Sequence, residues 1–307
     1  MNLKAVWAAG MLCVLALGLS GCSSGGGSSS SSGGSTYTGP YIYISDTGNS
    51  RLVRINDMTG AGLVALGTPG SGTYQFSKPA QLAFDSAGNL YIADAGNNRI
   101  VKATITNGQL SSWTVFTTAN NVSFNNPQGV AVDSAGNIYV ADTGNSRVCE
   151  LSSAGATLYT FSTGGGLTLK TPNSVAVDST GNIYCTDATL KEVVKFAPKF
   201  ASFVSLTGSY TNLDAVTVDS SNDFYLGQQT TTNPIYLYNS AAIELGVYSG
   251  AGLQASGFAL DSSNHLYVAD GPDNQIAETS IVAGAANNAL IAVYNNGLSH
   301  PTGIAFH

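Results

Sequence analysis

Short apolar segments alternate with short polar segments along this chain, and one arrangement of them, two apolar segments separated by a polar one, recurs. Residues 130–132 (VAV) and 138–141 (IYVA) are β-branched, aromatic or small at every position, which is typical of strands covered on both faces. Between them lies Asp133-Ser-Ala-Gly136-Asn137. Here the Asp side chain can accept from backbone N–H groups two residues on, and Gly136 adopts a left-handed conformation at little cost. The pattern predicts two adjacent strands joined by a tight turn.

The same block occurs five times without internal gaps, which indicates a repeat architecture. The copies span residues 79–95, 127–143, 172–188, 213–229 and 255–271. Their first Asp residues are separated by 48, 45, 41 and 42 positions, and they are Asp85, Asp133, Asp178, Asp219 and Asp261. A unit of about 40–50 residues is the size of one four-stranded propeller blade.

A sixth copy is divided between the two ends of the chain. Residues 301–307 match the start of the repeat, and residues 41–56 match its continuation. Joined, they form one blade, in which the C-terminus supplies the innermost strand and the N-terminus the outer ones. Such pairing closes the ring and removes free sheet edges. The sequence therefore predicts an all-β fold, a six-bladed β-propeller closed by pairing of the N- and C-terminal segments.

The repeated motif resembles the NHL repeat. Residues 85–99 (DSAGNLYIADAGNNR) and 133–147 (DSAGNIYVADTGNSR) carry it almost whole. The resemblance implies the propeller fold but leaves the function open, because NHL proteins include lyases, sensor domains, RNA binders and adhesive modules.

The N-terminal segment predicts export. Residues 1–21 place Lys4 before an apolar run from Ala5 to Leu19, too short for a permanent transmembrane helix, as in a signal peptide. Leu19-Ser20-Gly21-Cys22 resembles the lipobox of bacterial lipoproteins, which implies a lipid on Cys22. Residues 22–40 follow as a lipidated, Gly/Ser-rich linker, and residues 41–307 form the propeller. The alternative to a lipid anchor is an ordinary secretory signal and an unanchored periplasmic protein.

This organisation predicts a location in the bacterial cell envelope, on the extracytoplasmic side. If the cell has two membranes, Ser23 after the acylated Cys22 resembles a signal for the outer membrane or cell surface. We expect a monomer that binds an envelope protein, a glycan or a small molecule.

The charge of the chain disfavours nucleic acid as a partner. The full chain has 11 basic and 18 acidic residues, and removal of Lys4 with the signal peptide leaves a net charge of −8. No cluster of Lys and Arg is present to neutralise a phosphate backbone.

The recurring Asp residues are interpreted as architecture, and no metal or cofactor is expected. The second recurring Asp, such as Asp142, is expected to cap the next connection as Asp133 caps its own turn. Asp and Arg recur five residues apart at Asp46/Arg51, Asp94/Arg99 and Asp142/Arg147, which indicates bridging ion pairs. The pair is lost at Asp187/Glu192 and Asp270/Gln275.

Two cysteines remain after Cys13 is removed and Cys22 is lipidated. Cys149 and Cys185 each replace an apolar residue of a predicted strand, and their spacing matches no metal pattern. Two buried thiols are expected, with a disulfide in an oxidising envelope as the alternative.

Candidate binding residues form a ring at one mouth of the central channel, just after the start of each innermost strand. They are Ala80, Gln128, Asn173, Asp214, Ser256 and Thr302, and His300 lies next to them. This polar, mostly uncharged ring can hydrogen-bond a sugar, a peptide or a metabolite, or it can be a water-filled funnel. Residues 226–233 depart most from the repeat, either by drift or because a partner docks there.

No catalytic set is predicted. Related propeller enzymes, the peptidyl-hydroxyglycine lyases and the streptogramin lyases, use zinc held by several histidines or a catalytic histidine. This chain has three histidines, of which His265 is expected in a turn away from the mouth and His307 at the C-terminus. We therefore expect a non-catalytic binding or scaffold module. The alternative is a metal-dependent lyase or lactonase-like hydrolase with its site at the propeller axis.

Overall fold

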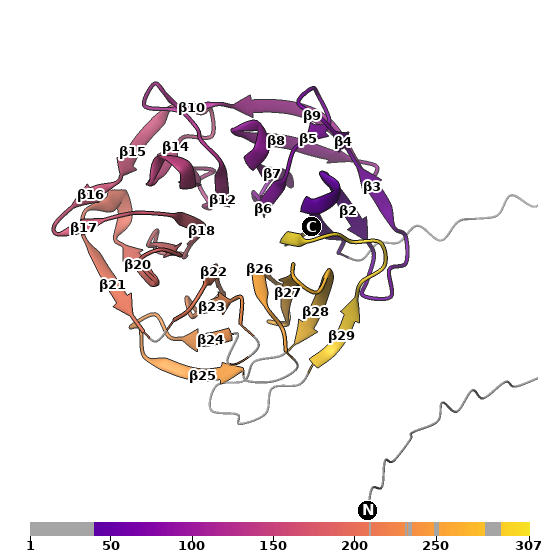
Figure 1. Ribbon diagram of the computed structural model, residues 1–307. Helices are drawn as coiled ribbons and strands as arrows, with labels where there is room; N and C mark the ends of the chain where they lie inside the picture. The colour runs from indigo at the N-terminus through magenta and orange to yellow at the C-terminus, as the bar shows by residue number, and fades with distance from the viewer. Residues whose placement is uncertain (1–39, 209, 231, 233–234, 249–251, 280–289) are drawn as a thin grey trace, which may run out of the picture. The chain divides into compact units, whose positions relative to one another are not determined.

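The computed structural model describes residues 40–208, 210–230, 232, 235–248, 252–279 and 290–307. In this part of the chain, six antiparallel four-stranded sheets stand in a ring with their first strands around a central axis (Figure 1). The predicted all-β, six-bladed propeller is thus confirmed. The predicted signal peptide, Cys22 and all of the linker before Pro40 lie outside the described residues. No helix among the described residues is long and apolar enough to cross a membrane.

We number the blades from the N-terminus and give their strands from the axis outwards. Blade 1 contains β30 (Pro301–Phe306), β1 (Ile42–Asp46), β2 (Arg51–Ile55) and β3 (Val64–Leu66). Blade 2 contains β6 (Pro79–Phe84), β7 (Asn89–Asp94), β8 (Arg99–Thr106) and β9 (Gln109–Phe116). Blade 3 contains β12 (Pro127–Val132), β13 (Ile138–Asp142), β14 (Arg147–Leu151) and β15 (Thr157–Phe161).

The remaining blades follow in the same order. Blade 4 contains β18 (Pro172–Val177), β19 (Ile183–Asp187), β20 (Glu192–Phe196) and β21 (Phe203–Thr207). Blade 5 contains β22 (Leu213–Val218), β23 (Phe224–Gln228), β24 (Ile235–Tyr238) and β25 (Glu244–Tyr248). Blade 6 contains β26 (Ala255–Leu260), β27 (Leu266–Asp270), β28 (Gln275–Thr279) and β29 (Leu290–Tyr294).

Short two-stranded ribbons and single 3-10 turns complete the described connections. The ribbons are β4–β5 (Thr68–Pro69, Gln75–Phe76), β10–β11 (Thr118–Ala119, Val122–Ser123) and β16–β17 (Thr163–Gly164, Leu167–Thr168). The 3-10 turns are η1 (Thr47–Asn49), η2 (Ala95–Asn97), η3 (Thr143–Asn145) and η4 (Pro198–Phe200).

Blade 1 closes the ring, as the sequence predicts. The C-terminal strand β30 pairs antiparallel with β1, and Ile44 lies opposite Ile304. The backbones of Tyr41 and His307 extend the pairing with two hydrogen bonds, of 2.8 and 3.1 Å. The two ends of the propeller therefore hold each other in the sheet.

The core consists of hydrophobic clusters between adjacent blades. Between blades 2 and 3, for example, Tyr91 and Ile100 pack with Val140 and Cys149. Each second strand is covered on both faces, and every residue of β13 is buried. This arrangement explains why the second strands are continuously apolar instead of alternating.

Cys149 and Cys185 are free and buried, so the expectation of two unpaired thiols is confirmed. Burial raises the pKa of Cys149 to about 12 and raises that of Cys185 as well. Because the thiolate is the reactive form, both side chains act as small apolar residues of the core.

The first recurring Asp of each repeat closes its turn. Oδ1 of Asp133 accepts hydrogen bonds from the backbone N–H groups of Ala135 (2.9 Å) and Asn137 (2.8 Å). Gly136 has a φ of 83°, the left-handed conformation predicted for it. The same two bonds occur at Asp85, Asp178, Asp219 and Asp261.

The second recurring Asp has a different role in blades 1 to 3 from the one expected. Oδ1 of Asp94 accepts from the backbone N–H of Ser77 at 2.7 Å, in the loop that leads into β6. Its Oδ2 accepts from Arg99 at 2.7 Å. The expected cap of backbone N–H groups in the following connection is absent from these blades, where the carboxylate binds that connection only through an Asn side chain, Asn97 at 2.8 Å in blade 2. In blade 4 the expected cap is present, because Oδ1 of Asp187 accepts from the backbone N–H groups of Thr189 (3.2 Å) and Leu190 (3.0 Å). The predicted Asp–Arg ion pairs are confirmed at Asp46/Arg51, Asp94/Arg99 and Asp142/Arg147.

Candidate functional site

A β-bulge near the start of each innermost strand creates the predicted ring of side chains. In β12, Pro127 pairs with Asp142 and Gly129 pairs with Ala141, so Gln128 has no partner across the ladder. Bulges redirect the extra residue. The bulge residues of the six blades are Thr302, Ala80, Gln128, Asn173, Asp214 and Ser256, and in blade 2 Gln81 next to Ala80 is also without a partner across the ladder.

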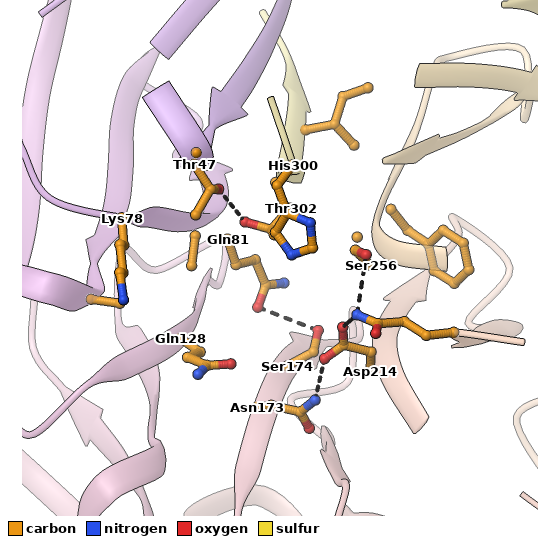
Figure 2. A pocket seen from close by; sticks show the side chains of 18 of the residues that line it. Thr47, Lys78, Gln81, Gln128, Asn173, Ser174, Asp214, Ser256, His300 and Thr302 are labelled. Atoms are coloured by element: carbon orange, nitrogen blue, oxygen red, sulfur yellow. Dashed lines mark hydrogen bonds between the residues drawn. The ribbon is translucent and has the colours of Figure 1, made fainter. Parts of the chain in front are cut away.

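All six bulge residues and His300 line one cavity of about 560 Å³ at the mouth of the channel. We call it the mouth cavity. It lies on the side of the connections between second and third strands, because Thr47 and Ala95 also line it. Its volume is within the range typical of small-molecule sites. Figure 2 shows the polar side chains of Gln128, Asn173, Asp214 and Thr302 around this space.

Asp214 is held by two amide side chains. The Nδ2 group of Asn173 donates to one carboxylate oxygen, and the Nε2 group of Gln229 donates to the other. Asn173 is itself fixed, because its Oδ1 accepts from Thr186 at 2.9 Å. The carboxylate therefore has a defined orientation before any ligand arrives.

The network continues from Gln229 to Ser256. Nε2 of Gln229 donates to Ser256 Oγ at 3.2 Å, and the backbone N–H of Gly271 donates to the same oxygen at 3.3 Å. The Ser256 hydroxyl donates no hydrogen bond to any described residue, so its own proton is available to a ligand. A Cβ added at Gly271 would lie 2.9 Å from Ser256 Oγ and 3.1 Å from His300 Nδ1, so both side chains pack against this glycine.

Burial raises the pKa of Asp214 to about 6, and the hydrogen bonds from Asn173 and Gln229 act against this rise. No ion pair of Asp214 occurs among the described residues. At neutral pH the mouth cavity thus contains an ionised carboxylate that hydrogen bonds stabilise and that contacts no cation of the described residues.

Gln81 separates the mouth cavity from the other end of the channel. Its Nε2 donates to the carbonyl oxygen of Val175 at 2.9 Å, and its Oε1 accepts from the backbone N–H groups of Val130 (3.2 Å) and Val175 (3.1 Å). The side chain thus reaches from blade 2 to blades 3 and 4. Gln81, Phe258 and Ile304 line both the mouth cavity and a second pocket of about 280 Å³.

Sequence reasoning missed Gln81, Gln229 and Lys78, which also line the mouth cavity. A signal for Gln81 was present, because the corresponding residues of the other blades are small: Gly129, Ser174, Ala215, Gly257 and Gly303. Gln229 lies within residues 226–233, the segment that departs from the repeat.

The three histidines occupy different environments. His300 lines the mouth cavity and is exposed, and its backbone N–H donates to Asn274 at 2.7 Å. Nδ1 of His265 lies 3.1 Å from Asp261 and 3.5 Å from Glu278, away from the mouth cavity. The ring of His307 packs on Phe84. Among the described residues, no group of three or more His, Cys, Asp or Glu side chains is arranged to hold a metal ion.

Two known families of repeats match parts of this sequence. The NHL repeat family matches residues 76–103 and 124–151, and a family described as a beta-propeller repeat matches residues 163–186. The chain therefore contains NHL repeats within a six-bladed β-propeller. No curated protein is similar to it in sequence.

Solved propeller structures share the fold at low identity. A protein of unknown function from Bacteroides caccae has a TM-score of 0.63 and 14% identity, covering 88% of this chain and 99% of that one. Virginiamycin B lyase from Staphylococcus aureus has a TM-score of 0.59 and 16% identity, covering 88% and 89%. A catalytically inactive His-to-Ala variant of that lyase, with quinupristin, has a TM-score of 0.62 and 14% identity, covering 88% and 91%. At these identities the likeness is one of fold.

Proposed function

We propose that this chain is a non-catalytic binding protein of the bacterial cell envelope, whose mouth cavity captures a small polar ligand. A lipid on Cys22 holds the propeller on the extracytoplasmic side of the membrane, and residues 22–40 act as the tether. The observation that carries the binding role is the orientation of Asp214 by Asn173 and Gln229 inside a cavity of about 560 Å³. Such preorganised polar groups reduce the entropy lost on binding.

Calorimetry on the full chain, expressed with its own N-terminus and purified in detergent, tests the binding role. The probes are amino acids, short peptides and mono- and disaccharides, measured with the wild type, Asn173→Ala and Thr217→Val. Asn173 lines the mouth cavity, whereas Thr217 lines the pocket at the other end of the channel. We expect at least one probe to bind the wild type and Thr217→Val equally and Asn173→Ala at least 10-fold more weakly. Equal binding by all three proteins would contradict a role for the mouth cavity.

The anchor has its own test. Mass spectrometry of the purified protein should detect an acylated Cys22 as the first residue, and Cys22→Ser should move the protein from the membrane to the soluble fraction. An unmodified Cys22 in a soluble wild-type protein would overturn the anchor without affecting the ligand site.

A lyase or lactonase-like hydrolase is the second candidate. It is favoured by His300 and Asp214, which line the same cavity, because a carboxyl group with a pKa of about 6 can accept and donate protons near neutral pH. Incubation with virginiamycin B, the substrate named for the similar fold, and with lactones would reveal turnover by mass spectrometry. Elemental analysis of the same preparation tests the metal-dependent form. Turnover lost in His300→Ala would replace the non-catalytic proposal.

A further inference from the structure

Two opposite charges face each other across the mouth cavity. Asp214 belongs to blade 5, and Lys78 lies in the loop that leads into β6 of blade 2. Blades 2 and 5 are three positions apart in a closed ring of six, so the residues lie on opposite sides of the axis. Figure 2 shows Lys78 and Asp214 at opposite walls of the cavity.

The backbone holds Lys78 in place, and its ammonium group has no partner in the part of the chain that the structure describes. Its φ of 49° lies in the left-handed region, and the preceding residue, Ser77, is bound by Asp94. Asn126 and His300, at the matching places of blades 3 and 1, have φ values of 50° and 47°. No ion pair or hydrogen bond involves the Lys78 ammonium group among the described residues, and the residue is exposed. A ligand anion therefore meets an unpaired cation here.

Asp214 presents the complementary charge in a less hydrated setting. Both amide groups that bind it are already oriented, and its remaining lone pairs have no partner of positive charge among the described residues. An ammonium group binds an ionised, partly buried carboxylate through a charge-assisted hydrogen bond, which is roughly twice as strong as a hydrogen bond between neutral groups.

The wall between the two charges suits peptide groups. The hydroxyl oxygen of Ser256 accepts from Gln229 and Gly271, and no described residue accepts its proton, which is therefore available for a carbonyl oxygen. No hydrogen bond to a described residue occupies the side-chain amide of Gln128, which has one acceptor and two donor hydrogens. Both side chains match the alternating N–H and C=O groups of a peptide backbone.

We infer that the mouth cavity binds a short peptide with free termini, its amino group at Asp214 and its carboxylate at Lys78. Consecutive Cα atoms lie about 3.8 Å apart, so the two terminal charges of a dipeptide or tripeptide are farther apart than those of a single amino acid. The longer molecule is therefore better able to place them at opposite walls. This inference rests on the proposed ligand-binding role of the cavity.

Calorimetry with four forms of trialanine tests the inference: free, N-acetylated, C-amidated and blocked at both ends. We expect the free peptide to bind and each single block to weaken binding about 10- to 100-fold, as charged hydrogen bonds would. Asp214→Asn should bind the free and acetylated peptides equally, and Lys78→Met should bind the free and amidated peptides equally. Lys170→Met is the matched control, because Lys170 is an exposed lysine in the corresponding loop of blade 4 and lies outside the mouth cavity.

The outcomes separate the inference from the proposed function. Equal binding of free and blocked peptides to the wild type, which needs no variant, would overturn the inference. If the protein bound a neutral disaccharide but none of the peptides, the inference would also be overturned, although the proposed ligand site would then stand. Retained discrimination in both variants, with unchanged thermal unfolding, would also overturn the roles of Asp214 and Lys78.

Discussion

Oδ1 of Asp46 accepts a hydrogen bond of 2.7 Å from the backbone N–H of Ser299, a residue 253 positions away in the sequence. The other carboxylate oxygen of Asp46 binds Arg51 and Asn49. This one buried side chain therefore links the N-terminal strand of blade 1 to the loop that leads into β30, and it places His300 at the mouth of the channel.

Asp46→Ala should weaken the closure of the ring. The substitution leaves the N–H of Ser299 without its acceptor and the Arg51 guanidinium without its carboxylate, and we expect a loss of about 2–4 kcal/mol in the free energy of unfolding. Denaturant titration measures the loss. Asp57→Ala serves as the control, because Asp57 lies in an exposed turn and binds Thr59 locally. Equal effects of the two substitutions would argue against a closing role for Asp46.

Two of the three Asp–Arg pairs, Asp94/Arg99 and Asp46/Arg51, should differ in strength according to their burial. The side chain of Arg99 is 10% exposed and also donates to the carbonyl oxygens of Ser71 and Gln75, whereas the side chain of Arg51 is 32% exposed. Lysine cannot reproduce the guanidinium fork. Arg99→Lys should therefore cost about 2–3 kcal/mol and Arg51→Lys about 1 kcal/mol or less, measured by denaturant titration. The reverse order would contradict this explanation.

Gln81→Ala should open the channel between the mouth cavity and the pocket at its other end. Without the amide, the backbone N–H groups of Val130 and Val175 lose their acceptor and the carbonyl of Val175 loses its donor. We expect a loss of about 2–3 kcal/mol in stability. Hydrogen exchange should be faster at the amides of Val130 and Val175.

A matched control for Gln81 is available in the neighbouring blade. Gln128→Ala removes a side-chain amide of the same size. Gln128 lines the mouth cavity but not the pocket at the other end of the channel. It should leave the exchange of Val130 and Val175 unchanged. Unchanged exchange in Gln81→Ala as well would show that Gln81 does not seal the channel.

Cys149 and Cys185 should resist thiol reagents in the folded protein. Both side chains are buried, and the raised pKa of Cys149, about 12, keeps it protonated at neutral pH. A colorimetric thiol assay should detect neither residue until denaturant is added and both afterwards. Failure to detect them in denaturant unless a reductant is present would indicate a disulfide and contradict the structure.

Local patterns in the sequence were enough to predict the blades. The turn at Asp133, the left-handed Gly136 and the Asp142/Arg147 pair all depend on residues within five positions of each other, and the repeat multiplies each signal. Blade 1 was predictable because each half of its motif kept enough of the repeat to align.

Contacts between blades were not predictable in the same way. Gln81 contacts Val175 across 94 positions, and Asp46 contacts Ser299 across 253, so neither partner follows from local spacing. The role of Gln229 was missed for a related reason. It lies where blade 5 departs from the repeat, so the other blades offer no template for its contact with Asp214.

Asp214 should make the protein less stable as the pH rises from about 4 to 6. Its pKa is about 6 in the folded chain, against an ordinary value of 3.8, because burial disfavours the charged form. Between these values the folded state binds more protons than the unfolded state, so stability falls with rising pH in this window and is constant above it. Two pKa units correspond to roughly 2–3 kcal/mol. His300 and Lys78 also line the cavity, and no titratable group contacts the carboxylate among the described residues.

Denaturant titration from pH 4 to pH 8 measures the unfolding free energies of the wild type and of Asp214→Asn. Their difference reports the titration of Asp214 alone, because the titrations of the other groups cancel. We expect the wild type to lose roughly 2–3 kcal/mol relative to the variant between pH 4 and pH 7. Asp57→Asn is the control. Hydrogen bonds from Thr59 lower the pKa of Asp57 below its ordinary value of 3.8, so its difference should stay nearly flat from pH 4 to pH 8, and any change near pH 4 should have the reverse sign. A flat profile for Asp214→Asn would mean that the pKa of Asp214 is the same in the folded and the unfolded chain, and it would contradict the rise that burial causes.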